Sequence, residues 1–151
     1  MINPADPDWE YTHAGRPYSY KYGYGSIDAY AYVTAAKKWE LVKPPAWLET
    51  QTIQIAGGTM NDDGDMEGGE RIRPGGVRST IAVTQEMLLE NNLEEVEHIT
   101  VKVWITHTRR GDVEVEIVSP NGIKSILAAA RRSDSADTGF PGWTFMTIKH
   151  W

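Results

Sequence analysis

Serine and histidine are the residues of this chain that could do hydrolytic chemistry, because together with an acid they can form a catalytic triad. A triad serine commonly sits on a sharp turn in a Gly-x-Ser-x-Gly motif, and the sequence contains no such motif. The possible bases share no spacing that suggests a role with a serine; they are His13, His98, His107 and His150. These residues alone indicate no self-sufficient enzyme, and we predict no catalytic residue.

An acidic, glycine-rich stretch at 57–76 could bind calcium. Four of its residues match positions three, five, six and twelve of the EF-hand loop: Asn61, Asp63, Gly64 and Glu70. Position one, which is normally Asp, is Thr59 here, and no helical pattern flanks the stretch. We therefore interpret it as a solvated surface insertion, and we predict no metal ligand and no cofactor-binding residue.

Two further motifs have both a chemical and a structural interpretation. Arg110-Gly111-Asp112 matches a cell-adhesion tripeptide. However, a glycine between two alternating apolar runs is typical of a tight turn, and we predict a hairpin turn there. Four tyrosines alternate with other residues and could stack on sugars or bases: Tyr18, Tyr20, Tyr22 and Tyr24. An extended backbone would put their rings on one side, and we favour packing against other protein groups.

The whole-chain composition narrows the class of protein. A length of 151 residues suits one ordinary domain, and 40% hydrophobic with 24% charged residues is not the composition of a disordered chain. A net charge of −6 argues against a nucleic-acid partner. The N-terminus lacks the features of a signal peptide, and no apolar run approaches the roughly 20 residues that span a bilayer. The absence of cysteine leaves the redox compartment open.

Most aromatic residues precede position 48, and we divide the chain into residues 1–42 and 43–151. In the first part, apolar residues recur every four positions: Ile27, Ala31, Ala35 and Trp39. This spacing predicts a helix over 27–39 with Ser26 as its N-cap. Pro44-Pro45 then begins a linker.

Residues 43–151 show the two-residue alternation of short β-strands. Strands are expected at 53–55, 77–83, 99–105, 113–117, 123–127 and 143–147. The hairpin turns are expected at 110–112 and at Pro120-Asn121-Gly122, and Thr84 is expected to cap a short helical turn through Leu89. Several short antiparallel strands predict a β-sandwich or jelly roll.

Several motifs resemble one protease family. Tyr22-Gly23-Tyr24-Gly25-Ser26-Ile27-Asp28-Ala29 is similar to the segment that opens the last helix of a subtilisin-like catalytic domain. Lys37-Lys38-Trp39 resembles the exit from that helix in the kexin and furin branch. Further blocks resemble, in the family's order, the P domain (Homo B domain) of proprotein convertases: Glu97-His98-Ile99-Thr100-Val101, Arg110-Gly111-Asp112, Val118-Ser119-Pro120-Asn121-Gly122, Ala130-Arg131-Arg132-Ser133-Asp134 and Gly139-Phe140-Pro141-Gly142-Trp143-Thr144-Phe145-Met146-Thr147. The resemblance covers almost the whole chain and favours the kexin side.

The resemblance implies a division of the chain. Residues 1–42 would be the C-terminal end of a subtilisin-like α/β catalytic domain with its last helix. Residues 43–151 would be a P domain, a galactose-binding-like β-sandwich whose closing strands are missing. The family's triad and oxyanion asparagine would lie upstream of Met1, so none is carried over to any position. We therefore expect a chain that is truncated at both ends.

The resemblance also implies a function. The family consists of calcium-dependent serine endopeptidases of the late Golgi membrane that cleave secretory precursors after paired basic residues. The P domain would stabilise the catalytic domain of the same polypeptide and tune its calcium and pH dependence. The calcium ligands belong mainly to the catalytic domain, so we assign none here. Because a helix with one apolar face must bury it, we expect residues 18–47 to form part of the seam between domains, anchored by Trp39 and Trp47.

Two alternatives from other classes stay open. The chain could be a stand-alone β-sandwich module whose exposed aromatic residues bind carbohydrate or protein, or a structural interaction domain without a ligand. A binding module would be a folded, soluble 151-residue product. An incomplete sandwich would instead expose a strand edge and half its core, and would be insoluble or molten.

Overall fold

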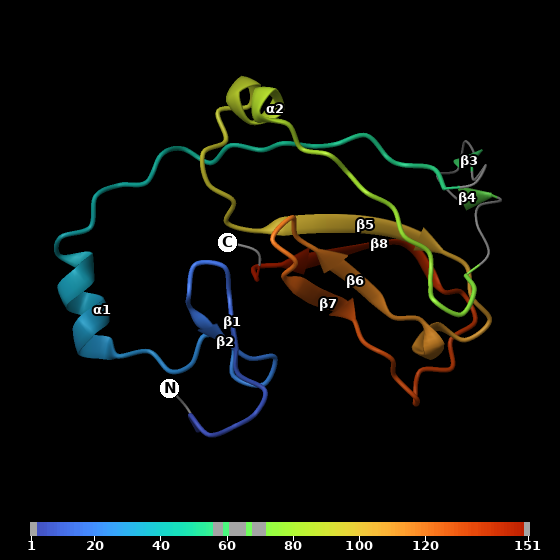
Figure 1. The fold of residues 1–151 in the computed structure, drawn as a ribbon, viewed down its shortest axis with the longest axis horizontal. Coiled ribbons are helices and arrows are strands. Elements are labelled where there is room, and N and C mark those ends of the chain that lie inside the picture. Colours follow the sequence, from blue (N-terminus) through green and yellow to red (C-terminus); the bar gives the residue numbers. More distant parts are fainter. Residues whose placement is uncertain (1–2, 56–58, 61–65, 68–71, 150–151) are drawn as a thin grey trace.

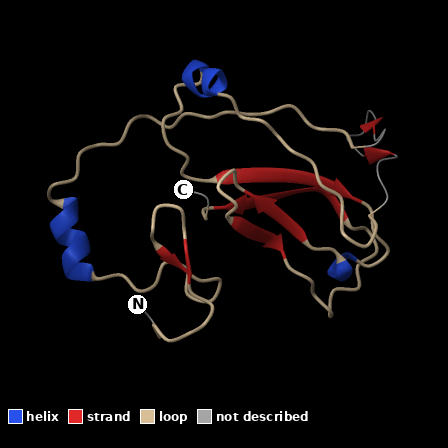
Figure 2. Ribbon diagram, viewed as in Figure 1, coloured by secondary structure: helices blue, strands red, loops and turns tan. Residues whose placement is uncertain are grey.

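A computed structural model describes residues 3–55, 59–60, 66–67 and 72–149. All of its named strand pairs are antiparallel, and strands outnumber helices (Figures 1 and 2), which confirms a mainly β chain. The helices are α1 (Ala29–Ala36), α2 (Gln85–Glu90) and the short 3-10 helix η1 (Arg110–Asp112). The strands are β1 (Glu10–Tyr11), β2 (Pro17–Tyr18), β3 (Thr59–Met60), β4 (Met66–Glu67), β5 (Ile99–Ile105), β6 (Val115–Val118), β7 (Lys124–Ala128) and β8 (Phe140–Thr147).

The long pair β5–β8 dominates the β part of the chain (Figure 1). The alternation predicted at 99–105 forms β5, and the strand predicted at 143–147 forms β8, which begins earlier, at Phe140. Ile99 lies opposite Thr147 and Ile105 lies opposite Phe140, with a register shift between Val103 and Trp104. The partner of β5 is therefore the last strand described and not its neighbour in sequence.

This pairing corrects the hairpin turn predicted at 110–112. Those residues form η1, and β6 pairs with β7 instead of folding back on β5. The second predicted turn is confirmed, because Pro120-Asn121-Gly122 joins β6 to β7. There the Ser119 amide donates to the Ile123 carbonyl at 2.9 Å, and Gly122 adopts a φ of 82°, which a residue with a Cβ rarely adopts.

The core lies between the two strand pairs and is small. Its buried apolar residues are Val113, Ala128 and Phe140, and the partly buried Val103, Ile105, Val115 and Phe145 pack against them. The two sheets meet at a buried hydrogen bond between the hydroxyls of Ser125 on β7 and Thr147 on β8, which lie 2.7 Å apart. Burial of so few side chains gives limited hydrophobic stabilisation. Polar contacts therefore contribute a larger share of the free energy of folding of this part of the chain.

Both predicted helices are present, with local differences. α1 is shorter than the predicted 27–39, and its N-cap is Asp28 and not Ser26. The Asp28 carboxylate accepts a hydrogen bond from the Ala31 amide at 2.9 Å, as a capping side chain does. Thr84 caps α2 as predicted. Among the described residues, no helix has the length and apolar character to cross a membrane.

The strands predicted at 53–55 and 77–83 are wrong. Residues 51–55 and 74–83 carry no strand, and Ile53, Ile81 and Val83 are exposed. Figure 1 shows these segments running over the outside of the molecule. An alternating sequence becomes a strand only where a neighbouring edge supplies hydrogen bonds, and these segments have no such partner in the part of the chain that is described.

Candidate functional surfaces

The N-terminal residues fold into a compact aromatic arm, which we define as residues 9–24. β1 and β2 pair, and Ser19 bridges to Gly23, so the backbone turns back on itself between the tyrosines. Tyr18 meets Tyr20 and Tyr24 edge to face, with ring centroids 5.5 and 5.2 Å apart. Tyr22 instead stacks on Trp9 at 5.5 Å. The tyrosines therefore pack, as favoured, but the prediction that all four rings share one side is wrong.

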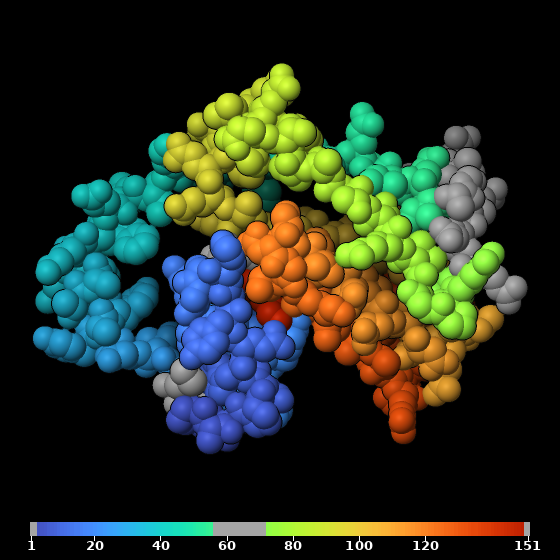
Figure 3. Space-filling model, viewed as in Figure 1, coloured from blue at the N-terminus to red at the C-terminus, as the bar shows by residue number. Residues whose placement is uncertain are grey.

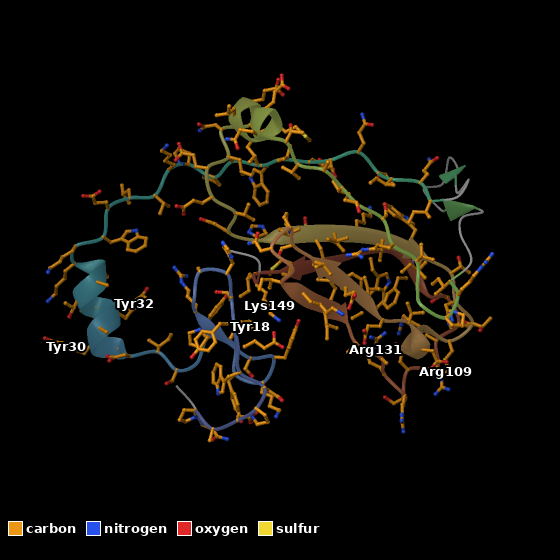
Figure 4. All side chains as sticks on the ribbon, in the orientation of Figure 1. Tyr18, Tyr30, Tyr32, Arg109, Arg131 and Lys149 are labelled. Carbon is orange, nitrogen blue, oxygen red and sulfur yellow. The ribbon has the colours of Figure 1, made fainter. Side chains whose placement is uncertain are left out.

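This arm holds a lysine from the far end of the described chain. The Lys149 side chain is only 4% exposed, and its Nζ lies 4.9 Å from the Tyr20 ring centroid and 5.6 Å from that of Tyr18. Its Nζ also lies 2.5 Å from a carboxylate oxygen of Glu10. Figure 4 shows Tyr18 and Lys149 close together. Cation–π contacts of a desolvated ammonium are worth about 2 kcal/mol each, so Lys149 fixes the arm against the end of β8.

Two hydrogen bonds extend this contact to neighbouring strands. The Tyr24 hydroxyl donates to the Ile148 carbonyl at 3.0 Å, and the Ile126 amide on β7 donates to the Tyr20 hydroxyl at 2.7 Å. Tyr18 is half-buried in this contact, and its burial raises the pKa of the phenol. No local sequence pattern indicated Lys149, because the contact joins residues more than 120 positions apart.

A second cluster surrounds Asp134. The Arg110 guanidinium forms a two-pronged pair with the Asp134 carboxylate, at 2.8 and 3.0 Å, and lies 4.8 Å from the Trp143 ring centroid. Arg131 approaches the same carboxylate at 3.4 Å. The Arg110 hydrogen bonds hold the pKa of Asp134 below its usual value. Arg110 and the buried Gly111 are thus structural members of this cluster, which supports the structural interpretation of Arg110-Gly111-Asp112 over the adhesive one.

The predicted seam residues on α1 and after it are exposed. No residue of α1 is buried, and Trp39 and Trp47 are 67% and 68% exposed. A shallow groove on α1 is lined by Tyr32, Ala35, Ala36 and Trp39. Figure 3 shows this helix standing away from the β part of the chain. Trp47 makes one edge-on contact, with the His98 ring at 5.3 Å between centroids.

The predicted EF-hand residues Asn61, Asp63, Gly64 and Glu70 lie outside the described residues, and so does His150. Within the described ranges, no group of three or more His, Asp or Glu side chains could hold a metal ion. The His107 ring nitrogen contacts the backbone of Arg109, at 2.7 and 3.1 Å. The absence of catalytic, cofactor-binding and metal-binding residues stays a prediction.

Comparison with known proteins assigns the chain to a family. Residues 96–151 match the model of the proprotein convertase P-domain. The chain is 42% identical over 150 residues to Protease KEX1 of Kluyveromyces lactis, 34% identical over 147 residues to Kexin of Saccharomyces cerevisiae, and 35% identical over 144 residues to Furin of Rattus norvegicus. These alignments cover 99%, 97% and 95% of this chain, but it spans only 18%, 17% and 16% of the relatives' lengths. The chain therefore belongs to the kexin-like proprotein convertases, of which it represents a segment that includes P-domain sequence.

Proposed function

We propose that this chain is part of a kexin-like serine endopeptidase that processes secretory precursors after paired basic residues. The observation that carries the proposal is the similarity over nearly the whole chain to proteins named as proteases, one of them the "Dibasic-processing endoprotease" of Schizosaccharomyces pombe, 38% identical over 146 residues. Residues 1–42 would end the catalytic domain and residues 43–151 would form the P domain, with β5–β8 and β6–β7 as parts of its β-sandwich. The whole enzyme would work in the secretory pathway, at the late Golgi membrane.

The role of this segment would be to stabilise the catalytic domain, which supplies the reacting groups. The exposed α1 supports this role, since a helix with apolar residues and no buried face lacks the packing that stabilises most helices. α1 would be the last helix of the catalytic domain, and Trp39 and Trp47 would lie in the seam. Tuning of calcium and pH dependence would come with that stabilisation.

Replacement of Trp39 by alanine in the whole protein tests the seam. Trp39→Ala should lower the melting temperature and the rate of cleavage of a peptide containing Lys-Arg, because it removes a large aromatic anchor. Leu89→Ala is the matched control, since Leu89 on α2 is also exposed but lies outside residues 18–47. A melting temperature that is unchanged by Trp39→Ala would remove the seam assignment. Absence of any Lys-Arg cleavage by the wild-type whole protein would remove the protease assignment itself.

The stand-alone binding module is not favoured. The relatives named above are proteases by name, and the chain aligns with them over 99% and 95% of its length.

A further inference from the structure

The chain contains three pairs of adjacent basic residues: Lys37-Lys38, Arg109-Arg110 and Arg131-Arg132. If the proposed function holds, the protein carries potential cleavage sites for its own kind of activity. An endoprotease binds the residues around the cut bond in an extended form, with the basic side chains placed in its pockets. Whether each pair can adopt that form decides whether it is a substrate.

The peptide bond after Arg110 is held inside the fold. The Gly111 amide of this bond donates to the Asp134 carbonyl at 3.1 Å, and the Arg110 amide donates to the Ala136 carbonyl at 2.7 Å. The Arg110 side chain is 22% exposed and is paired with the Asp134 carboxylate. A Cβ at Gly111 would lie 2.1 Å from the Arg131 carbonyl oxygen, so the backbones touch directly. Neither the side chain nor the bond is free to enter a protease site.

The peptide bond after Arg132 is held by the other pair. The Arg132 carbonyl of this bond accepts a hydrogen bond from the Arg109 guanidinium at 2.6 Å. The Asp134 amide donates to the Arg131 carbonyl at 3.0 Å, which closes a turn around the bond. The Arg131 amide donates to the Gly111 carbonyl at 2.7 Å. The two Arg-Arg pairs therefore hold each other, with Arg110 in η1 and Arg132 in a turn, and Figure 4 shows Arg109 and Arg131 in the same region of the molecule.

The lysine pair is held by local hydrogen bonds at the end of α1, where the Lys38 amide donates to the Ala35 carbonyl at 3.0 Å and the Trp39 amide donates to the Ala36 carbonyl at 3.2 Å. Bonds at a helix end open by fraying, whereas the arginine pairs are held by residues distant in sequence. Lys37 and Lys38 are exposed at the C-terminal end of α1, where an extended segment begins. In the longer protein, the catalytic domain would cover this helix. In the isolated chain, the rate of cutting after Lys38 therefore serves as the internal reference for an accessible dibasic site.

We propose that Arg109, Arg110, Arg131, Arg132 and Asp134 form an arginine knot that withholds both Arg-Arg pairs from dibasic cleavage. This inference rests on the proposed function for its biological meaning, but the masking itself can be measured without it. Cleavage at a masked site requires local opening, and its rate then follows the population of the open form. The Asp134 carboxylate joins both pairs, so its loss should raise that population.

Limited proteolysis of the chain with trypsin and, separately, with kexin tests the knot. In the wild-type chain, cutting after Lys38 should be at least about tenfold faster than cutting after Arg110 or Arg132. Asp134→Ala should raise cutting after Arg110 and Arg132 by about tenfold or more, and leave cutting after Lys38 unchanged. Mass spectrometry of the fragments gives each rate in one digest.

Two control variants separate masking from general instability. Glu116→Ala removes a carboxylate that pairs with Lys124 at 2.8 Å, away from the knot, and should not raise cutting after Arg110 or Arg132. Ser125→Ala loses the buried bond to Thr147 and lowers stability without touching the arginines. The two variants are compared at an equal loss of melting temperature. If Ser125→Ala then raises the rates of cutting after Arg110 and Arg132 as much as Asp134→Ala does, the knot has no specific role and the proposal fails.

If Asp134→Ala does not fold, the masking can still be tested on the wild-type chain alone, by digestion with and without urea. Urea should abolish the difference between Lys38 and the two arginine sites, because the unfolded chain exposes all three pairs. Equal rates at the three sites in the native chain would overturn the masking. The two proposals can also fail separately. If trypsin cuts slowly after the arginines but the whole protein does not cut Lys-Arg peptides, the masking is supported and the proposed function is excluded.

Discussion

Gly111 occupies a position in which no larger residue fits. It is buried in η1, and a Cβ there would lie 2.1 Å from the Arg131 carbonyl oxygen and 2.4 Å from that of Asp134. Both distances are far below van der Waals contact, and the neighbouring atoms are backbone, which cannot rotate away. The glycine is therefore required by a close backbone approach and not by a hairpin turn.

We predict that Gly111→Ala lowers the free energy of unfolding by at least about 2 kcal/mol, because the chain around 131–134 must move away. Urea denaturation followed by tryptophan fluorescence measures the change. Asp112→Ala, on the exposed side of the same turn, should change stability by no more than about 0.5 kcal/mol. Similar effects of the two substitutions would contradict the close approach.

Asp134 makes the stability of this region depend on pH. The Arg110 hydrogen bonds favour its carboxylate, so the pKa in the folded chain lies below the ordinary value of 3.8. The stabilisation is therefore complete above the pKa of the unfolded chain and is lost as the pH falls through the lowered pKa of the folded chain. The pH dependence therefore falls in acidic conditions; at neutral pH the carboxylate is ionised in both states, and the stabilisation is complete and no longer changes with pH.

We predict that Asp134→Asn lowers the melting temperature above about pH 5 and flattens its decline toward pH 3, because the ionisable group is gone. Calorimetry at a series of pH values shows both changes. Asp112→Asn serves as the matched control, since it removes a carboxylate of the same region without breaking the Arg110 pair. Equal flattening by the two variants would exclude Asp134 as the source.

Among the elements, the aromatic arm supplies the largest contact that the sequence did not indicate. It lies against the middle of β7, where the Ile126 amide donates to the Tyr20 hydroxyl. It also lies against the end of β8, where the Tyr24 hydroxyl donates to the Ile148 carbonyl. A strand edge with a free amide is a site of unwanted pairing, and the arm occupies that amide. Lys149 anchors the arm through Glu10, Tyr18 and Tyr20.

We predict that Lys149→Met releases the arm and speeds hydrogen exchange at the Ile126 amide by about tenfold or more, equivalent to ~1.4 kcal/mol. Amides within β5 should keep their protection, because their partners lie on β8. Lys43→Met is the control, since Lys43 lies outside the arm and makes an exposed ion pair with Glu94, which is of little energetic value. Unchanged exchange at Ile126 would show that the arm does not depend on Lys149.

At the scale of the whole molecule, the exposed surface is large for the mass. The chain of 16.9 kDa exposes 11,898 Å², whereas a folded monomer of this mass exposes about 7,700 Å². The exposed apolar side chains include those of Trp39 and Leu41 in the extended segment after α1. This exposed apolar surface is the one that the proposed seam would cover.

We predict that the 151-residue chain binds a hydrophobic dye and self-associates at micromolar concentration, because its apolar surface is unsatisfied. Trp39→Ser together with Leu41→Ser should reduce both effects, whereas Thr34→Ser on α1 should change neither. Sedimentation and dye fluorescence measure them. A monomer without dye binding at all concentrations would contradict an uncovered seam.

The sequence by itself determined the features that depend on neighbouring residues. The alternation at 99–105 predicted β5, Pro120-Asn121-Gly122 predicted the β6–β7 turn, and Thr84 predicted the start of α2. Each is a local signal, since side-chain periodicity, φ preference and capping act within a few residues. The family motifs also lie in the sequence and led to the assignment that the comparisons confirm.

Only the tertiary structure decided which distant residues meet. It paired β5 with β8, placed Lys149 among tyrosines of the arm, and joined the two Arg-Arg pairs through Asp134. It also left the alternating residues 77–83 without a strand partner. These outcomes depend on which edges and charges are brought together by the chain as a whole, because a strand or an ion pair needs a partner that local sequence does not specify.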